Sequence, residues 1–374
     1  MDFHFENNTI KIIHQNKTFH LHPIWLRERL PGEKYFDLDT NQRLYEPSSI
    51  DLKLKIISCK LSDHKLDVEF NDGAKGQYRL NDLLIEMDEE KNKRGPLPKR
   101  ILWNSQLEVI PQAIFEENMV EKESMYNLLM DFYKYGFVII KNVPTESKYL
   151  LNFVNSIGPV KVTNFGEFFD VMSKPNPNDL AYKPIALPPH TDNPYRKPEA
   201  PGIQFLHCLK NEVSGGFSTL VDGFSVAEYI KLNEPEAFES LTKTNLRYRF
   251  QDKDIILENW GELIELDKDG DYKQVRYSTR VDYVPPLENE KLESFYKARK
   301  LLGDLYTSSD FEIKFKLSPG DVMMFDNHRL LHGRTSYDSS EGARHLQGCY
   351  LEFDSTDGKL RHLHEKYHLS ETNL

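Results

Sequence analysis

The first ninety residues of the chain alternate apolar and polar positions over short stretches. This period of two is typical of strands with one buried face, and it predicts strands at 9–14, 52–57 and 65–70. Asn71-Asp-Gly73 is a turn sequence directly after the third strand. A short helix is predicted at 80–87, and the charged stretch 88–98, with its Gly and Pro residues, predicts a linker. We therefore expect a small β-rich domain at residues 1–95, followed by a larger domain at residues 96–374.

The larger domain begins with helical periodicity and continues with short strands. Apolar residues recur at helical spacing in 120–134, Gly136 ends that helix, and 137–140 is typical of a buried strand. A second helix is predicted at 146–157. Beyond residue 203, turn residues separate further elements, with helices expected near 225–232 and 289–305 and strands at 203–209, 218–221, 311–315, 322–325 and 345–353. Many strands with few helices predict a mainly β fold with flanking helices, built as a jelly-roll double sheet.

Charge, hydropathy and cysteine content exclude several classes of partner. A formal net charge of −11 argues against nucleic acid, because phosphate binding needs a basic surface. The apolar runs are too short to cross a bilayer, and the first residues lack the basic and apolar regions of a secretory signal. The three cysteines are widely spaced, as in reduced proteins without disulfides or cysteine-bound zinc: Cys59, Cys208 and Cys349. We expect a soluble cytoplasmic protein.

Candidate chemistry begins at His190 and Asp192, which follow two prolines. If a strand leaves those prolines, its alternation points both side chains to one face. An imidazole and a carboxylate are two of the three ligands of a two-histidine, one-carboxylate iron site. Taken alone the motif is short, and an exposed polar pair is the alternative. His332, in a polar loop predicted at 327–334, supplies a third ligand, with His328 as a rival that spacing does not exclude.

Arg344 stands at the start of the last predicted strand, directly before residue 345 and twelve residues after His332. Two histidines and one aspartate leave three coordination positions open for a bidentate acid, O2 and water. A dicarboxylate that chelates through a keto-acid end needs a cation for its far carboxylate, and an arginine can make a two-point contact there. Four other histidines fit structural roles: His207 in an apolar strand, and three in a polar tail helix, namely His362, His364 and His368.

Seven short motifs stand in order along the larger domain: His190-Thr-Asp192, Gly215-Gly216 with Ser218, Val221-Asp-Gly223, Pro319-Gly-Asp321, Phe325-Asp-Asn327, Leu331-His-Gly-Arg334 and Arg344-His-Leu-Gln-Gly-Cys-Tyr350. They closely resemble the γ-butyrobetaine hydroxylase family, the carnitine-pathway branch of the taurine-dioxygenase-like Fe(II)/2-oxoglutarate oxygenases. The resemblance covers nearly the whole chain, since that family also has a small β-rich amino-terminal domain. It implies a distorted double-stranded β-helix, or jelly roll, for the catalytic domain.

The resemblance implies roles for the polar residues of these motifs. It implies Fe(II) bound by His190, Asp192 and His332, and so favours His332 over His328. It also implies 2-oxoglutarate held by Arg344, with Ser218 as a helper. O2 is the second cosubstrate, and ascorbate is expected to be needed in vitro.

The family holds the trimethylammonium group of its substrate in an aromatic cage, where cation–π attraction favours a quaternary cation. The matching positions are Phe165, Phe169, Tyr182 and Tyr350. Packing in the core is the alternative for these rings. Asp179 stands among the substrate-binding positions, where an amide is common in the family.

The acidic end of the substrate has its own matching positions, Thr279 and Arg280. Arginine suits a carboxylate or a phosphonate, and a surface ion pair is the alternative for Arg280. Tyr195, in Asn193-Pro-Tyr195, is similar to the trimethylaminoethylphosphonate hydroxylases of the bacterial branch. Eukaryotic members of the family bind zinc through three cysteines and a histidine. The matching stretch, 25–35, has no cysteine, so we expect no zinc.

The sequence thus predicts a dioxygenase that hydroxylates a small trimethylammonium compound, with γ-butyrobetaine as the first substrate to test. A trimethylaminoethylphosphonate hydroxylase is the alternative, and a betaine-binding sensor without turnover is the non-enzymatic one. We expect no nucleic-acid or membrane partner, and a homodimer is left open.

Overall fold

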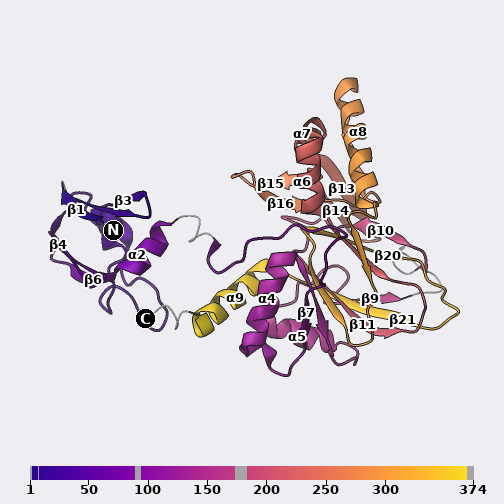
Figure 1. Ribbon diagram of the computed structural model, residues 1–374, viewed down its shortest axis with the longest axis horizontal. Helices are drawn as coiled ribbons and strands as arrows, with labels where there is room; N and C mark the ends of the chain where they lie inside the picture. The colour runs from indigo at the N-terminus through magenta and orange to yellow at the C-terminus, as the bar shows by residue number, and fades with distance from the viewer. Residues whose placement is uncertain (1, 7, 89–93, 173–182, 369–374) are drawn as a thin grey trace. The chain divides into compact units, whose positions relative to one another are not determined.

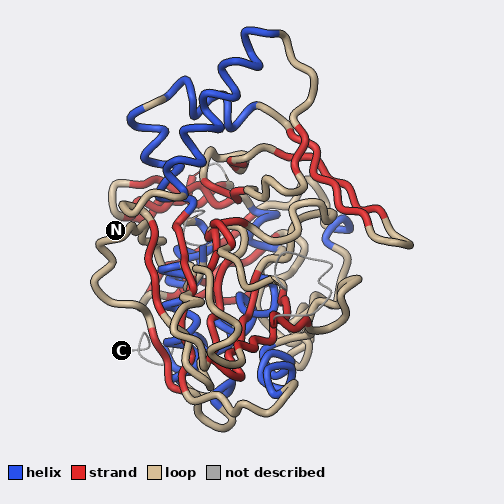
Figure 2. The backbone as a smooth tube through the Cα atoms, turned by 90° about the vertical axis from the view of Figure 1, so that its right-hand side faces the viewer, coloured by secondary structure: helices blue, strands red, loops and turns tan. Residues whose placement is uncertain are grey.

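A computed structural model describes residues 2–6, 8–88, 94–172 and 183–368. The chain forms two compact units, Met1–Gly95 and Pro96–Leu374 (Figure 1). Strand exceeds helix, at 32% against 27%. In Figure 2 the strands are red and the helices blue. The prediction of a mainly β fold is therefore confirmed. Over the described ranges, the longest apolar helical stretches fall short of what a membrane crossing requires.

The first unit contains two antiparallel three-stranded sheets. Their strands are β1 (Asp2–Glu6), β2 (Thr9–His14) and β3 (Lys17–Leu21) in one, and β4 (Ile56–Ser62), β5 (Lys65–Phe70) and β6 (Lys75–Arg79) in the other. Alternate residues of both sheets, such as Ile12 and Leu66, meet in one apolar core. The described part of this unit also contains the short helices α1 (Pro23–Arg27), η1 (Pro47–Ser49) and α2 (Leu80–Met87).

One predicted strand of this unit begins in the wrong place. Strand β4 starts at Ile56, whereas the alternating pattern placed a strand at 52–57. The Asp51 carbonyl accepts the Leu54 amide at 2.9 Å, and the Asp51 carboxylate accepts the Lys53 amide at 2.9 Å. An aspartate that binds nearby backbone amides favours a turn over a strand.

The second unit is built on a six-stranded and a four-stranded sheet. The order in the larger sheet is β7 (Gln112–Ile114), β8 (Phe137–Lys141), β19 (Val322–Asp326), β11 (Ile203–Asn211), β21 (Arg344–Leu351) and β9 (Phe169–Met172). The order in the smaller sheet is β10 (Leu187–His190), β20 (Leu330–Arg334), β12 (Ser218–Asp222) and β18 (Glu312–Phe315). Apolar residues of both sheets, among them Leu206 and Leu220, form one buried cluster. The two sheets therefore face each other.

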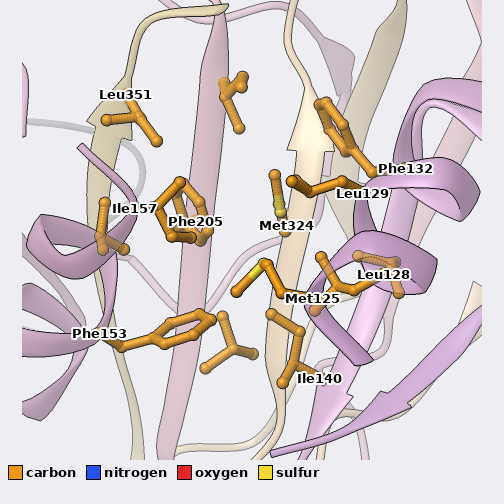
Figure 3. Close-up of a cluster of buried hydrophobic side chains, with 14 of the residues drawn as sticks. Met125, Leu128, Leu129, Phe132, Ile140, Phe153, Ile157, Phe205, Met324 and Leu351 are labelled. Atoms are coloured by element: carbon orange, nitrogen blue, oxygen red, sulfur yellow. The ribbon is translucent and has the colours of Figure 1, made fainter. Parts of the chain in front are cut away.

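Helices α4 (Glu123–Tyr135), α5 (Tyr149–Ile157) and α9 (Phe353–His368) cover the other face of the six-stranded sheet. Figure 3 shows Phe205 of β11 and Met324 of β19 pointing into the cluster that these helices complete. Phe205 and Leu206 lie on opposite faces because successive side chains of a strand alternate. The carboxy-terminal helix is not simply polar, since Leu360 is fully buried in this cluster.

The remaining elements form a third apolar cluster on the outer side of the four-stranded sheet, where Val221 and Leu331 are buried. The helices are α6 (Gly223–Asn233), α7 (Pro235–Lys243) and α8 (Asn289–Tyr306), with the short η2 (Met119–Glu121) elsewhere in the unit. The strands are β13 (Leu246–Gln251), β14 (Ile256–Gly261), β15 (Ile264–Leu266), β16 (Tyr272–Val275) and β17 (Asp282–Tyr283). Each sheet is thus covered on its outer side.

A buried ion pair connects these layers. Arg329 and Asp222 have side chains that are 1% and 0% exposed, and their Nη2 and Oδ2 atoms are 2.7 Å apart. Arg329 Nε also donates to Asp222 Oδ1 at 3.1 Å, and its guanidinium donates to the carbonyl of Lys134 in α4. Asp222 in turn accepts the amide of Phe224, in the first turn of α6, at 3.1 Å. The pair therefore ties α4, β12 and α6 to the segment before β20.

Candidate active site

Two neighbouring strands place two histidines opposite each other. His190 ends β10 and pairs with His332 of β20 across the antiparallel ladder, with 4.3 Å between the ring centroids. The expectation of a polar loop over 327–334 is wrong from Leu330 onward, because that segment is the buried strand β20. We also expected a strand that starts after the two prolines and carries both His190 and Asp192. Instead, β10 contains the two prolines and ends at His190. Prolines are tolerated there because β10 is an edge strand.

Asp192 lies beyond the end of β10, so strand alternation does not place its side chain. Asn327, which is 1% exposed, fixes the backbone instead. The Asn327 Oδ1 atom accepts the Asp192 amide at 2.7 Å, and Asn327 Nδ2 donates to the Asp192 carbonyl at 3.1 Å. The amide group also donates to the Pro201 carbonyl at 2.9 Å. The turn before β20 thus holds the segment that carries Asp192.

The three predicted ligands come together. His190 Nε2 and His332 Nε2 lie 3.5 Å and 3.9 Å from Asp192 Oδ1, and one ligand atom from each residue lies within 4.8 Å of the others. In the described ranges no second group of three His, Cys, Asp or Glu side chains is arranged in this way. The rival, His328, is elsewhere: its Nε2 atom is 2.8 Å from the Ala200 carbonyl.

This donor set fits a divalent transition metal. Ligand atoms at right angles, each about 2.1 Å from a metal, are roughly 3 Å apart, so small movements of these side chains suffice. Burial, with the neighbouring His190, lowers the pKa of His332 to about 3, and Asp192 only partly opposes this. A neutral imidazole offers its lone pair to a metal. Two imidazoles and one carboxylate on one side leave further coordination positions open.

Asp192 remains ionised in this setting. Burial by itself would raise the pKa of this carboxyl group, but the hydrogen bond with His190 and the electrostatic interactions with both histidine rings lower it overall. The Tyr350 hydroxyl contributes as well, because it donates to Asp192 Oδ2 at 2.7 Å. Asn193 Nδ2 donates to the same hydroxyl at 3.1 Å, and the Tyr195 hydroxyl donates to Asn193 Oδ1. A chain of side chains therefore orients the carboxylate.

A cavity of about 410 Å³ opens beside this group and has an aromatic wall. The ring centroids of Phe169 and Tyr350 are 5.2 Å apart, those of Tyr195 and Phe250 are 4.9 Å apart, and those of Phe165 and Phe250 are 5.7 Å apart. The aromatic wall is defined by these five residues. Sequence reasoning missed Phe250, since it lies in β13, far from every motif. The two other predicted contacts, Asp179 and Tyr182, lie outside the described residues.

Arg344 and Ser218 line the same cavity. Arg344 is 6% exposed, its Nε atom donates to the Gly216 carbonyl at 3.3 Å, and its guanidinium lies 5.5 Å from the Tyr337 ring centroid. Among the described side chains, no carboxylate forms an ion pair with it. Gly216 has φ +69° and would place a Cβ atom 2.7 Å from Arg344 Nε, so a larger residue there would displace the arginine.

The loop predicted to bind the acidic end of the substrate contributes Arg280, as expected, but Ser278 in place of Thr279. Arg280 lines the cavity, and its charge helps to lower the pKa of His332, which places it near the metal group. Thr279 is exposed and is not among the residues that line the cavity. Ser278, 5% exposed, takes its place. The Val281 amide donates to the Ser278 carbonyl at 3.0 Å, so a turn directs Thr279 outward.

Gln204 is a further cavity residue that the sequence did not reveal. It lies in β11 opposite Tyr350 and is 1% exposed. Its Oε1 atom has no hydrogen-bond partner among the described residues. A single glutamine in an apolar strand carries no local signal of such a position.

Comparison with known proteins defines the class to which this site belongs. Residues 113–350 match the sequence model "Taurine catabolism dioxygenase TauD, TfdA family". The chain belongs to this family and is a 2-oxoglutarate-dependent dioxygenase.

Within this class, the chain is similar over most of its length to dioxygenases named for γ-butyrobetaine or for trimethyllysine. The chain is 30% identical to the γ-butyrobetaine dioxygenase of Homo sapiens over 355 residues, which is 92% of this chain and 91% of that protein. It is 28% identical to the γ-butyrobetaine dioxygenase of Pseudomonas sp. (strain AK-1) over 338 residues, 89% of this chain and 88% of that protein. It is 30% identical to the mitochondrial trimethyllysine dioxygenase of Bos taurus over 367 residues, 94% of this chain and 83% of that protein. The predicted resemblance is confirmed.

Proposed function

We propose that this protein hydroxylates a small trimethylammonium carboxylate of the γ-butyrobetaine type, using Fe(II), 2-oxoglutarate and O2. The observation that carries the proposal is the group of His190, Asp192 and His332 beside a cavity with an aromatic wall. Relatives named γ-butyrobetaine dioxygenase match about nine-tenths of the chain, which supports this substrate class.

In this proposal the three ligand side chains hold Fe(II). When bound together with 2-oxoglutarate and O2, the iron supplies oxidation of an aliphatic C–H bond: one oxygen atom enters the substrate, the other enters succinate, and CO2 is released. The chain contributes the placement. Asn327 fixes the Asp192 backbone, and the Tyr350 hydroxyl orients its carboxylate. Partners of this kind keep metal ligands in place.

Arg344 is the proposed partner of the far carboxylate of 2-oxoglutarate, with Ser218 beside it. Burial lowers the pKa of Arg344, although an arginine remains charged at neutral pH. A buried guanidinium without a carboxylate partner is costly, and an incoming carboxylate would offset that cost through a two-point contact. This is the support for placing the cosubstrate at Arg344.

The trimethylammonium group would bind against the aromatic wall. Such a cation cannot donate hydrogen bonds, so ring faces recognise it better than polar groups do. Arg280 and Ser278 would receive the acidic end of the substrate, whereas Thr279 does not line the cavity. Asp179 and Tyr182 stay predictions.

We further propose that the two facing sheets of the second unit form a distorted double-stranded β-helix, which makes residues 96–374 the catalytic domain and residues 1–95 a small β-rich domain. The order of the four-stranded sheet supports this, because consecutive neighbours come from distant parts of the chain, as in jelly rolls. The expectations of a cytoplasmic location, no zinc, no nucleic-acid or membrane partner, and a need for ascorbate stay predictions, and a homodimer stays open.

The test is a substrate panel incubated with Fe(II), ascorbate and 2-oxoglutarate, and scored by a mass gain of one oxygen atom. It contains γ-butyrobetaine, trimethylaminoethylphosphonate and trimethyllysine. We expect γ-butyrobetaine to be hydroxylated fastest. Faster turnover of trimethylaminoethylphosphonate would favour the alternative function, that of a trimethylaminoethylphosphonate hydroxylase. Binding of a betaine without any product would support the sensor alternative.

A pair of variants tests the metal site in the same assay. His190→Ala should abolish substrate-dependent succinate formation because it removes a ligand. His362→Ala is the matched control, since it removes an exposed histidine of α9. Equal succinate formation by wild type and His190→Ala would exclude the proposed centre.

A further inference from the structure

Thr191, the residue between two metal-ligand positions, bonds to the loop that carries Ser278 and Arg280. Its amide donates to the Tyr277 carbonyl at 2.8 Å. Its Oγ1 atom accepts the Tyr277 amide at 3.0 Å. Thr191 is 2% exposed, so water does not compete for these bonds. Two short segments, far apart in sequence, are thus joined by a pair of hydrogen bonds.

The bonded loop lines part of the cavity beside the metal group. Ser278, the next residue after Tyr277, is buried and lines the cavity, and Arg280 lines it two residues later. On either side the loop is held by other elements. The Val275 amide donates to the His328 carbonyl at 2.8 Å, and the Arg249 amide donates to the Val281 carbonyl at 2.9 Å. Thr191 holds the part between these two anchors.

We propose that Thr191 is a positioning residue that sets the distance between the metal group and the anionic end of the substrate. This inference rests on the proposed function. The Oγ1 bond fixes Tyr277 relative to His190 and Asp192, so Ser278 and Arg280 keep a constant distance from both ligands. Oxidation of one particular C–H bond requires that constancy, because a displacement of about 1 Å from the productive geometry can cost on the order of 100-fold in rate.

The hydroxyl matters more than the size of the side chain. Valine has nearly the shape of threonine but cannot accept a hydrogen bond, so Thr191→Val leaves the Tyr277 amide without its acceptor. Serine retains the oxygen. The backbone bond from Thr191 to Tyr277 persists in both variants. The two variants therefore separate the hydroxyl bond from packing.

The experiment compares wild type, Thr191→Val and Thr191→Ser with γ-butyrobetaine. In Thr191→Val we expect the substrate KM to rise about tenfold, the effect of one lost hydrogen bond that leaves a buried donor unpaired. We also expect more succinate per hydroxylated product, because a misplaced substrate is oxidised less often. Fe(II) affinity and the KM for 2-oxoglutarate should stay within about twofold of wild type, since the residues proposed to bind them lie outside this loop. In Thr191→Ser, the substrate KM and the succinate formed per hydroxylated product should both be close to the wild-type values.

Thr219→Val is the matched control. Thr219 is 3% exposed, and its Oγ1 atom has no hydrogen-bond partner within the described ranges, so the same substitution there should change neither measurement. If Thr191→Val does not fold, Thr191→Ala gives the same comparison with a smaller side chain.

The outcomes are distinct. If Thr191→Val has the substrate KM of wild type and forms the same amount of succinate per hydroxylated product, the inference is overturned while the proposed function stays intact. Weakened Fe(II) binding as the sole change would also overturn it, because Thr191 would then act on the metal. If wild type hydroxylates none of the trimethylammonium compounds, the proposed function fails, and the inference fails with it.

Discussion

Replacing Tyr350 with phenylalanine separates two roles that this side chain combines. The ring belongs to the aromatic wall, 5.2 Å from the Phe169 ring centroid, while the hydroxyl donates to Asp192 Oδ2 at 2.7 Å. The sequence resemblance suggested only the first role. Phenylalanine retains the ring and removes the hydrogen bond, so any change in metal binding reports on the hydroxyl.

The size of the effect follows from the type of hydrogen bond. A hydrogen bond to a charged group contributes about 1.5–3 kcal/mol, and every 1.4 kcal/mol is about tenfold in a binding constant. Loss of a group that orients a metal ligand typically costs about 10- to 100-fold in metal affinity. We therefore expect the Kd for Fe(II) to rise about 10- to 100-fold in Tyr350→Phe. At saturating Fe(II), the substrate KM should change by less than about twofold, because the cation–π face is retained.

Anaerobic calorimetric titration with Fe(II) measures the first quantity, and initial rates over a range of γ-butyrobetaine concentrations measure the second. Tyr306→Phe is the control, because Tyr306 is fully buried in α8 and its hydroxyl has no hydrogen-bond partner in the described part of the chain. Unchanged Fe(II) affinity with a raised substrate KM would refute the reasoning, since Tyr350 would then act only through its ring.

Three further predictions concern stability and cosubstrate binding. Arg329→Met leaves the buried Asp222 carboxylate without its cation, so urea denaturation should show a loss of about 3–5 kcal/mol in unfolding free energy. Adding Asp222→Asn should recover part of this loss. A double variant that is less stable than Arg329→Met would contradict the prediction. Arg344→Lys keeps the charge but not the planar two-point contact, so the KM for 2-oxoglutarate should rise about tenfold, and an unchanged KM would exclude Arg344 from the cosubstrate site. Burial lowers the pKa of His207 from 6.5 to about 4, so the unfolded chain binds more protons between these values and stability falls as pH drops through that window. From pH 7 to pH 5 the unfolding free energy should fall by about 2 kcal/mol because of His207. His207→Leu should make the unfolding free energy less dependent on pH over this range. An unchanged pH dependence would refute the assignment of this effect to His207.

Local patterns predicted the elements whose burial depends on their own sequence. The helix at Leu80–Met87 and the strand at Lys65–Phe70 have the predicted bounds, because each carries its own apolar face. Strand β20 was taken for a loop, because His332, Gly333 and Arg334 are polar or small and gave no alternating pattern. Their neighbours β10 and β12 make that segment a strand, and such pairing partners lie more than a hundred residues away.

The candidate site also contains residues that local motifs predict and residues that only the packing of distant segments reveals. The motif residues His190, Asp192 and His332 were named from sequence, and the structure brings them together. Phe250 and Gln204 could not be found in this way, because each reaches the cavity only through the packing of a distant strand. Thr279 was misplaced by one residue for the same reason: a turn, and not the residue type, decides which side chain of that loop points inward.

The placement of His190 on an edge strand has a mechanical consequence. Among the described residues, strand β10 has a single neighbour in its sheet. It also contains two prolines that cannot donate to a ladder, so few backbone hydrogen bonds hold it there. A metal bound by His190 and His332 would act as a cross-link between the edge and the interior of that sheet, closing a loop of about 140 residues. Because such a bond exists only in the folded chain, metal binding would stabilise the fold as well as enable the reaction. A chelator should therefore lower the unfolding temperature and release β10 first, which hydrogen exchange at the amides of Leu187 and His190, the two residues of β10 that have an N–H group, would detect.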